Sequence, residues 1–213
     1  WTTTTEDRSI GRRTRALHRG CQALTCLPES VGRLAALASL DLTSCSALRC
    51  LPEALGQCVA LGTLNLGHCT ALTSLPASVG GMEGLTTLSL QWCERLTCLP
   101  ESLGKLARLA ALNLRSCWAL SRLPESLGHL AALTTLTLNC CSRLTCLPES
   151  SGQLASMTAL DATECAALAR LPESMGQLML TKLTLFHCQA LTCLPESLGQ
   201  MTALSLLCLF VPG

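Results

Sequence analysis

The stretch LPESVGRLAALASLDLTSCSALRC, residues 27–50, decides the fold because the chain repeats it with a period of 24 residues. Close copies occupy residues 51–74, 75–98, 99–122, 123–146 and 147–170. A 23-residue copy fills 171–193, and a shortened copy fills 194–213. Self-similarity at a fixed period of about 20 to 50 residues indicates a repeat architecture rather than one globular core.

The second half of each unit predicts a short β-strand. In the first copy, alternation sends Leu40 and Leu42 inward, while Ser39, Asp41 and Thr43 face outward. A strand this short cannot bury its apolar face alone. We therefore expect the strands of neighbouring units to stack into a parallel sheet over a continuous leucine core.

The first half, L-P-E-S-L-G, predicts a short helical or 3-10 segment on the opposite, convex side. Proline fixes a helical φ and suits a first-turn position, and glutamate suits a helix N-terminus. Glycine at the sixth position, from Gly32 to Gly199, is expected to permit a turn that is closed to bulkier residues.

Composition agrees with one side-chain shape reused at equivalent positions. The 213 residues include 49 leucines, but only three tryptophans, two phenylalanines and no tyrosine. Charged residues make up 14%, against about 25% in an ordinary soluble domain. The net charge of +1 gives no global attraction to nucleic acid or to membranes, and no uncharged apolar run approaches the roughly 18 residues of a membrane span.

These observations predict an α/β fold, a right-handed solenoid (horseshoe) with a parallel β-sheet on its concave face. The spacing LxxLxLxxCxxL resembles the leucine-rich repeat signature. The whole unit, LPESLGxLxxLxxLxLxxCxxL, most resembles the repeats of plant intracellular nucleotide-binding immune receptors, and it is also similar to repeats of algal proteins and some bacterial effectors. The resemblance covers the repeats only, because no segment resembles a nucleotide-binding domain, a signalling domain or an F-box.

We divide the chain into an N-terminal arm or degenerate capping segment, residues 1–20, and a solenoid, residues 21–213. The solenoid comprises the tail of one repeat (21–26), seven full repeats (27–193) and a shortened last repeat. The arm holds five of the fifteen basic residues, Arg8, Arg12, Arg13, Arg15 and Arg19. It is either a first repeat kept soluble by arginines or an arm that touches nucleic acid or an acidic partner. Neither end shows a cap, so we expect a longer chain or other subunits to cover the ends.

Eight of the sixteen cysteines recur at the position that many leucine-rich repeats fill with asparagine, just after the strand. They are Cys21, Cys45, Cys69, Cys93, Cys117, Cys141, Cys165 and Cys188. We expect their buried thiols to bond weakly to the backbone of the neighbouring turn. Pairing between neighbours such as Cys26 and Cys50 is a lesser alternative. So many thiols favour a reducing, intracellular (cytoplasmic) location.

No catalytic, metal or cofactor site is predicted. The chain lacks CxxC and HxxxH pairs, a GxSxG elbow, a GxxxxGK[ST] loop and a GxGxxG motif. Half of the fourteen acidic residues stand in the repeated LPE motif, where a structural role is expected. His129 is expected to be a solvated residue of the convex segment. We therefore expect a protein that is not an enzyme and has no small-molecule substrate.

The outward strand positions are mostly small and neutral, and variation concentrates in the last two columns. The residues predicted to bind a partner on the concave face are His68, Gln91, Trp92, Asn113, Arg115, Asn139, Asp161 and Phe186. Trp92 is the leading candidate, because tryptophan and arginine concentrate binding energy, unless its ring folds against its own repeat. Phe186 and Phe210 form a second patch or cover the core of the terminal repeats. Trp118 is expected in a loop.

The sequence therefore predicts a protein-binding module, with nucleic acid and membrane disfavoured as partners. The resemblance implies the sensing region of an intracellular immune receptor. A scaffold or adaptor, a rigid structural subunit held through its ends and convex face, and a substrate recruiter are the alternatives.

Overall fold

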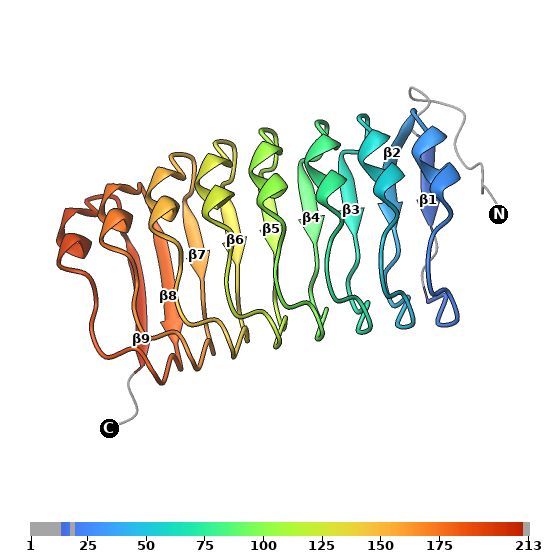
Figure 1. The fold of residues 1–213 in the computed structure, drawn as a ribbon. Helices are drawn as coiled ribbons and strands as arrows, with labels where there is room; N and C mark the ends of the chain where they lie inside the picture. The colour runs from blue at the N-terminus through green and yellow to red at the C-terminus, as the bar shows by residue number, and fades with distance from the viewer. Residues whose placement is uncertain (1–13, 18–19, 211–213) are drawn as a thin grey trace.

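The predicted solenoid is confirmed in the computed structural model of the chain, which describes residues 14–17 and 20–210. The strands are β1 (Thr14–Leu17), β2 (Leu37–Asp41), β3 (Thr63–Asn65), β4 (Thr87–Ser89), β5 (Ala111–Asn113), β6 (Thr135–Thr137), β7 (Ala159–Asp161), β8 (Lys182–Phe186) and β9 (Leu206–Phe210). They form one parallel sheet in sequence order, with the coils side by side (Figure 1).

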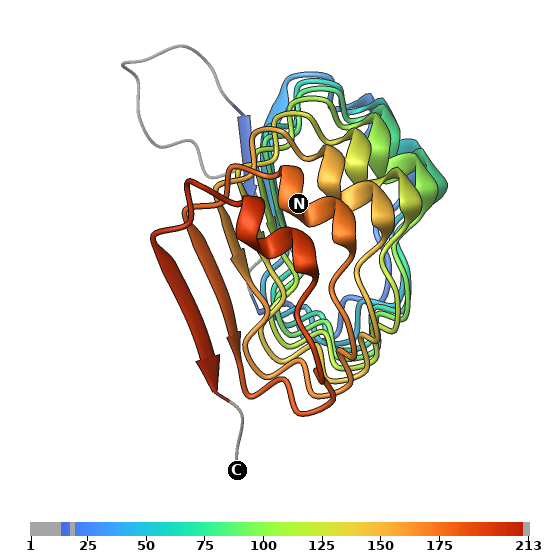
Figure 2. The same cartoon turned by 90° about the vertical axis from the view of Figure 1, so that its left-hand side faces the viewer.

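Eight 3-10 helices of five residues each face the sheet across the core (Figure 2). They are η1 (Glu29–Arg33), η2 (Glu53–Gln57), η3 (Ala77–Gly81), η4 (Glu101–Lys105), η5 (Glu125–His129), η6 (Glu149–Gln153), η7 (Glu173–Gln177) and η8 (Glu196–Gln200). Each coil therefore contributes one short strand and one short helix, as the two halves of the repeat predict.

Equivalent residues of successive coils pair in register. Leu40 pairs with Leu64, and Leu64 pairs with Leu88. All three leucines are at most 2% exposed and belong to one continuous core. Because equivalent residues pair in register, identical side chains of neighbouring coils contact one another, and successive coils pack in the same way.

The role expected of the proline is wrong in one respect. Pro52 has a φ of −71° but a ψ of 148°, so it is extended and precedes η2, which begins at Glu53. The same geometry recurs at the prolines before the other 3-10 helices. Proline therefore ends the extended segment, which suits a residue whose fixed φ is compatible with both conformations.

The repeated glycine occupies a position closed to bulkier residues, as expected, but its own backbone conformation is not the reason. The glycines inside the helices do not have a positive φ. A Cβ at Gly104 would instead lie 2.4 Å from the carbonyl oxygen of Ser126, and one at Gly128 would lie 2.3 Å from that of Ser150. Glycine is required there because consecutive 3-10 helices approach so closely that the backbone of one coil occupies the place of a side chain.

Glutamates of the LPE motif connect successive coils. The Oε2 atoms of Glu53 and Glu101 accept the backbone N–H of Ser78 and Ser126, each at 3.0 Å. The glutamate thus caps the first turn of the next 3-10 helix and not that of its own. Hydrogen bonding from the side chain and backbone of Ser78 holds the pKa of the Glu53 carboxyl below its ordinary value, and that from Ser126, chiefly its backbone N–H, does the same for Glu101.

The N-terminal segment contributes β1, which pairs with β2 in parallel and adds a coil to the sheet. Residues 1–13 and 18–19, with Arg8, Arg12, Arg13 and Arg19, lie outside the described residues. The division of the chain at residue 20 stays a prediction.

Candidate functional site

In each coil from β2 to β8, the strand is followed by a non-glycine residue in the left-handed conformation. These residues, with φ between 58° and 63°, are Ser44, His68, Trp92, Ser116, Cys140, Glu164 and His187. His68 and Trp92 are thus not outward strand positions, contrary to the prediction, but lie in the turn after the strand. The backbone reverses here, so that the cysteine that follows turns into the core, and none of the seven residues is glycine.

The turn is held by hydrogen bonds between coils. The N–H of His68 donates to the carbonyl of Gln91 at 2.8 Å, and that of Trp92 donates to the carbonyl of Arg115 at 2.7 Å. A non-glycine residue at positive φ is strained. The bonds to the next coil offset this strain and fix the direction in which the side chain leaves the strand.

The expected bonding is confirmed for six of the eight ladder cysteines, whereas Cys21 is exposed and not buried as expected. The Cys93 thiol donates to the carbonyl oxygen of Leu66 at 3.3 Å, and the Cys117 thiol donates to that of Leu90 at 3.1 Å. Cys69, Cys141, Cys165 and Cys188 do the same in their coils. Burial raises the pKa of Cys69 to about 12 and raises the pKa of Cys93 still further. These thiols are structural, whereas Cys26 and Cys50 are exposed thiols and not a disulfide.

His68, Trp92 and Trp118 form an aromatic cluster across three consecutive coils. The His68 ring stacks on Trp92 with centroids 5.6 Å apart and planes 9° apart. Trp118 meets Trp92 edge to face, also at 5.6 Å. Trp92 is therefore packed between neighbouring coils and not against its own, and Trp118 is 41% exposed. The cluster presents aromatic surface at the margin where the strands end.

Trp118 is a member of this site that the sequence did not predict. Trp118 follows the ladder cysteine of its coil, so it was expected only as a loop residue. The available signal was the spacing of 26 residues from Trp92, one period plus two. The left-handed turn at Trp92 places the two columns next to one another, and that turn was not expected.

Gln91, Asn113 and Arg115 lie beside the cluster on the concave face. Asn113 donates from Nδ2 to Oε1 of Gln91 at 3.4 Å, and its Oδ1 accepts the backbone N–H of Arg115 at 3.0 Å. The Gln91 side chain passes over Gly67, where a Cβ would lie 3.2 Å from its Cγ. The Arg115 side chain is exposed. The structure therefore brings five of the predicted residues together, including His68 and Trp92.

Asn139 and Asp161 form a separate polar pair. Nδ2 of Asn139 donates to Oδ2 of Asp161 at 2.8 Å, while Oδ1 of Asp161 accepts the N–H and hydroxyl of Thr163 at 3.1 and 2.7 Å. The Oδ1 atom of Asn139 is buried and bonds to no described residue. These bonds tie both side chains to the strand ends, so their availability to a partner is lower than that of Arg115.

Phe186 lies at the end of β8, several coils from the aromatic cluster. Its ring meets His187 edge to face with centroids 4.2 Å apart, and it is 38% exposed. The structure thus does not bring Phe186 together with Trp92. The side chain of Phe210 lies outside the described residues.

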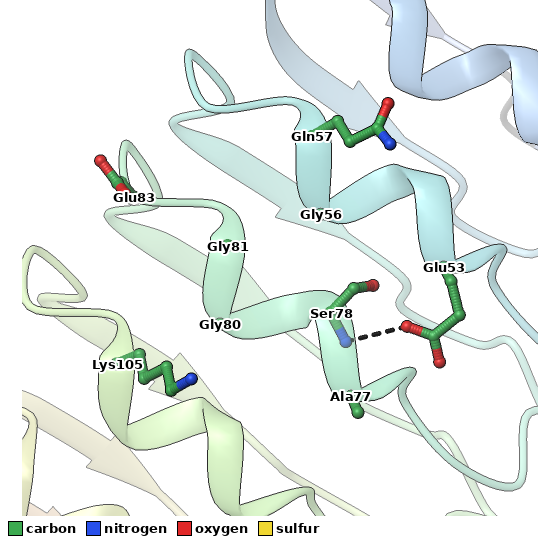
Figure 3. A pocket seen from close by; sticks show the side chains of 9 residues that line it. All are labelled: Glu53, Gly56, Gln57, Ala77, Ser78, Gly80, Gly81, Glu83 and Lys105. Atoms are coloured by element: carbon green, nitrogen blue, oxygen red, sulfur yellow. Dashed lines mark hydrogen bonds between the residues drawn. The ribbon is translucent and has the colours of Figure 1, made fainter.

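A shallow depression lies on the convex side, between η2, η3 and η4 (Figure 3). It forms where Ala77 and Gly81 replace the glutamate and the longer side chain found in most other coils. Glu53, Glu83 and Lys105 line it, and the Glu53 carboxylate is occupied by the N–H of Ser78. The depression is polar and open, and it lies across the molecule from the predicted concave residues. His129 is exposed in η5, as expected.

Within residues 14–17 and 20–210, no three His, Cys, Asp or Glu side chains gather as metal ligands would. The helices described here are also too short and insufficiently apolar for any of them to cross a bilayer.

Known structures share this architecture. The leucine-rich repeat domain of the type III effector XopL is 26% identical, with a TM-score of 0.61 over 87% of this chain and 73% of that one. A leucine-rich repeat protein of Leptospira interrogans is 24% identical, with a TM-score of 0.54 over 95% of this chain. The chain spans 63% of the length of the Leptospira protein. A search of curated protein sequences finds no significant match.

The sequence itself matches the family described as "Leucine-rich repeat region" over residues 14–145, more than half of the chain. The match begins with β1 and ends in the turn after β6, so it follows the coils of the structure. The chain belongs to the leucine-rich repeat family.

Proposed function

We propose that the chain is a non-catalytic recognition module that binds a protein partner through its concave face, anchored by the aromatic cluster and Arg115. The aromatic cluster carries this proposal. The chain has only three tryptophans, two phenylalanines and no tyrosine, yet two tryptophans and a histidine meet at one place. Tryptophan and arginine are the residues in which interfaces concentrate their binding energy.

The surroundings of the cluster suit an extended protein surface. The first outward column beside it consists of small residues, Thr63, Thr87, Ala111 and Thr135. They leave the sheet accessible, and the backbone ladder beneath them is continuous from coil to coil. A rigid surface loses little conformational entropy on binding. This continuous, accessible surface fits a protein better than a small molecule.

The intracellular location and the sensing role belong to the same proposal. Ladder thiols that donate hydrogen bonds must be reduced, which supports a reducing compartment. The role of an immune-receptor sensor, in a plant or alga, rests on the likeness of the 24-residue unit to the repeats of such receptors.

A pull-down from native extract, followed by mass spectrometry, tests the concave site. The variant combines His68→Ser, Trp92→Ser, Arg115→Thr and Trp118→Ser, because the chain itself places serine or threonine at these positions in other coils. The matched control combines Thr63→Ala, Thr87→Ala and Thr135→Ala, since Ala111 and Ala159 occupy that column naturally. Circular dichroism verifies that both fold.

We expect a partner that the wild type and the control both retain and that the cluster variant loses, with at least about thirtyfold weaker binding of the purified partner. Equal capture by the folded cluster variant would remove the concave site from the proposal.

A second candidate function is a structural subunit held through its ends and convex face. Leu206, Leu207 and Leu209 of β9, the last strand described, are 43%, 38% and 44% exposed. Sedimentation velocity tests it: a wild type that self-associates and a Leu207→Lys, Leu209→Lys variant that does not would support the subunit, whereas two monomers would contradict it.

A further inference from the structure

Charge is segregated between two margins of the solenoid. We call the five residues between each ladder cysteine and the following Leu-Pro pair the flank segment, for example residues 94–98 and 118–122. The turns after the strands, which lead directly into the flank segments, form the lower margin of the solenoid in Figure 1. The 3-10 helices lie toward its upper margin. The flank segments hold five arginines and one acidic residue, Glu94. The 3-10 helices and the turns after them carry eight glutamates against three basic residues, Arg33, Lys105 and Arg108.

Four of the flank arginines follow one another without a gap, one in each coil from β4 to β7. We call Arg95, Arg122, Arg143 and Arg170 the arginine stripe. All four are exposed, and none forms an ion pair within the described part of the chain. They alternate between the second and the fifth position of the flank segment, so the stripe zigzags along the solenoid.

The backbone beneath the stripe is regular. The N–H of Ala119 donates to the carbonyl of Glu94 at 3.2 Å, and that of Ala169 donates to the carbonyl of Thr145 at 3.0 Å. Cys146 and Arg170 form a parallel bridge. Adjacent coils are therefore spaced as strands are, at about 4.8 Å, and three steps from Arg95 to Arg170 cover about 14 Å. An extended peptide of about four or five residues spans that length.

We propose that the arginine stripe binds a short acidic segment of a protein partner. Guanidinium groups grip carboxylates with two parallel hydrogen bonds, and the stripe contains arginine without lysine. Trp118, at the first position of the same flank segment as Arg122, adds an exposed indole beside the stripe. The partner segment is thus a run of Asp or Glu.

An acidic segment fits better than a nucleic acid or an anionic membrane. Residues 21–213 hold ten basic and twelve acidic residues, so the solenoid as a whole does not attract a polyanion. The glutamates of the 3-10 helices and of the turns after them repel a long polyanion. Stacking of successive bases requires a row of aromatic rings, whereas Trp118 is the only aromatic residue in the described flank segments. A segment of a few residues stays within the stripe and avoids the glutamates.

The test is fluorescence anisotropy of the full chain with fluorescein-labelled hexaglutamate. The stripe variant combines Arg95→Ala, Arg122→Ser, Arg143→Ala and Arg170→Ser, which are residues that other coils carry at these positions. The control removes four charges elsewhere, by Arg33→Gln, Lys105→Gln, Arg108→Ala and Lys182→Ala, again with residues from other coils. Both variants are verified by circular dichroism.

We expect the wild type and the control to bind hexaglutamate, high salt to weaken that binding, and the stripe variant to bind at least about tenfold more weakly. Absence of binding by the wild type, or equal weakening in both variants, would overturn the proposal. Tighter binding of a labelled dT6 oligonucleotide, or of phosphatidylserine vesicles, would replace the acidic peptide by that ligand.

The proposal for the arginine stripe and the proposal for the concave site can be tested separately. The variant with His68→Ser, Trp92→Ser and Arg115→Thr leaves the stripe intact and is expected to bind hexaglutamate as the wild type does. Loss of hexaglutamate binding in that variant would place the acidic ligand on the concave face and overturn the stripe.

Discussion

At the scale of single residues, the missing Cβ of the repeated glycine allows neighbouring coils to approach each other closely. The carbonyl oxygen of Ser126 lies where a Cβ of Gly104 would be, at 2.4 Å. Real Cβ atoms essentially never approach another atom so closely. The coils therefore stack at strand spacing on the convex side only because the sixth residue of the repeat has no side chain.

Gly104→Ala should destabilise the fold by about 2 kcal/mol, since the added methyl group meets backbone that cannot move aside. Gly199→Ala is the matched control, because it is the same position in η8 and a Cβ there meets nothing within 4 Å. Denaturant unfolding followed by circular dichroism compares the two free energies of unfolding. A similar small change in both variants would show that the coils can spread.

The residues of the candidate site were only partly predictable from the sequence. The outward positions of the strands follow from a period of two, and this placed Gln91, Asn113 and Arg115 correctly on the concave face. The left-handed turn was not predictable, because residues as different as serine, tryptophan and glutamate occupy it. Its conformation comes from bonds to the next coil, which no local sequence preference encodes. Missing this turn also meant missing the contact between Trp92 and Trp118.

The exposed cysteine thiols should react with an alkylating reagent faster than the buried ones. Cys21, Cys26, Cys50 and Cys193 are exposed, so they should react first with iodoacetamide. The buried thiols, Cys45, Cys58, Cys69, Cys93, Cys117, Cys141, Cys165 and Cys188, should react only on unfolding. Mass spectrometry of peptides after timed labelling gives the order. Early labelling of Cys93 or Cys117 in the folded protein would contradict the buried ladder.

At the scale of elements, neighbouring 3-10 helices stabilise one another through close backbone packing and through hydrogen bonds from backbone N–H groups to glutamate side chains. A helix of five residues has almost no stability alone. Four of them, η2, η3, η5 and η8, gain from the glutamate of the preceding coil, as Glu53 accepts the N–H of Ser78 and Glu173 accepts that of Ser197. This accounts for the recurrence of glutamate in LPE, which the sequence analysis attributed to the helix start within its own coil.

These glutamates should make the convex side sensitive to acid. Hydrogen bonds from Ser78, Ser126 and Ser197 lower the folded-state pKa of Glu53, Glu101 and Glu173 below 4.5. A lowered pKa means that the stabilisation is complete above the unfolded pKa and is lost as pH falls through the folded one. We therefore expect the free energy of unfolding to fall below about pH 4.5, and to fall less steeply when the three residues are changed to glutamine. Parallel curves for both proteins would exclude this role.

At the scale of the whole molecule, periodicity made the fold predictable. A repeat that buries its leucines only against its neighbours has one way to stack, so the strand, the helix and their order follow from one unit. The ends and the surface are different, because they depend on residues that depart from the repeat. The aromatic cluster and the arginine stripe are such departures, and they are where function is proposed.

The cysteine ladder should couple the stability of the whole solenoid to alkaline pH. Burial raises the folded-state pKa of Cys69 to about 12 and raises those of Cys93, Cys117, Cys141 and Cys165 as well. Below about pH 8.5 the thiols are protonated in both states, so stability does not depend on them. Above that pH the unfolded chain loses protons that the folded chain keeps, so the free energy of unfolding falls as pH rises.

Cys117→Ala isolates one rung of this ladder. At pH 7 the variant should be destabilised by about 1 to 2 kcal/mol, because the carbonyl of Leu90 loses its thiol donor in the core. Between pH 9.5 and 11 its free energy of unfolding should fall less steeply than that of the wild type, by about 1.4 kcal/mol per pH unit, which is the contribution of one proton. Denaturant unfolding under reducing conditions at several pH values measures both effects. Equal slopes would mean that the Cys117 thiol ionises as easily in the folded chain as in the unfolded one, and the ladder would then not be sealed from water.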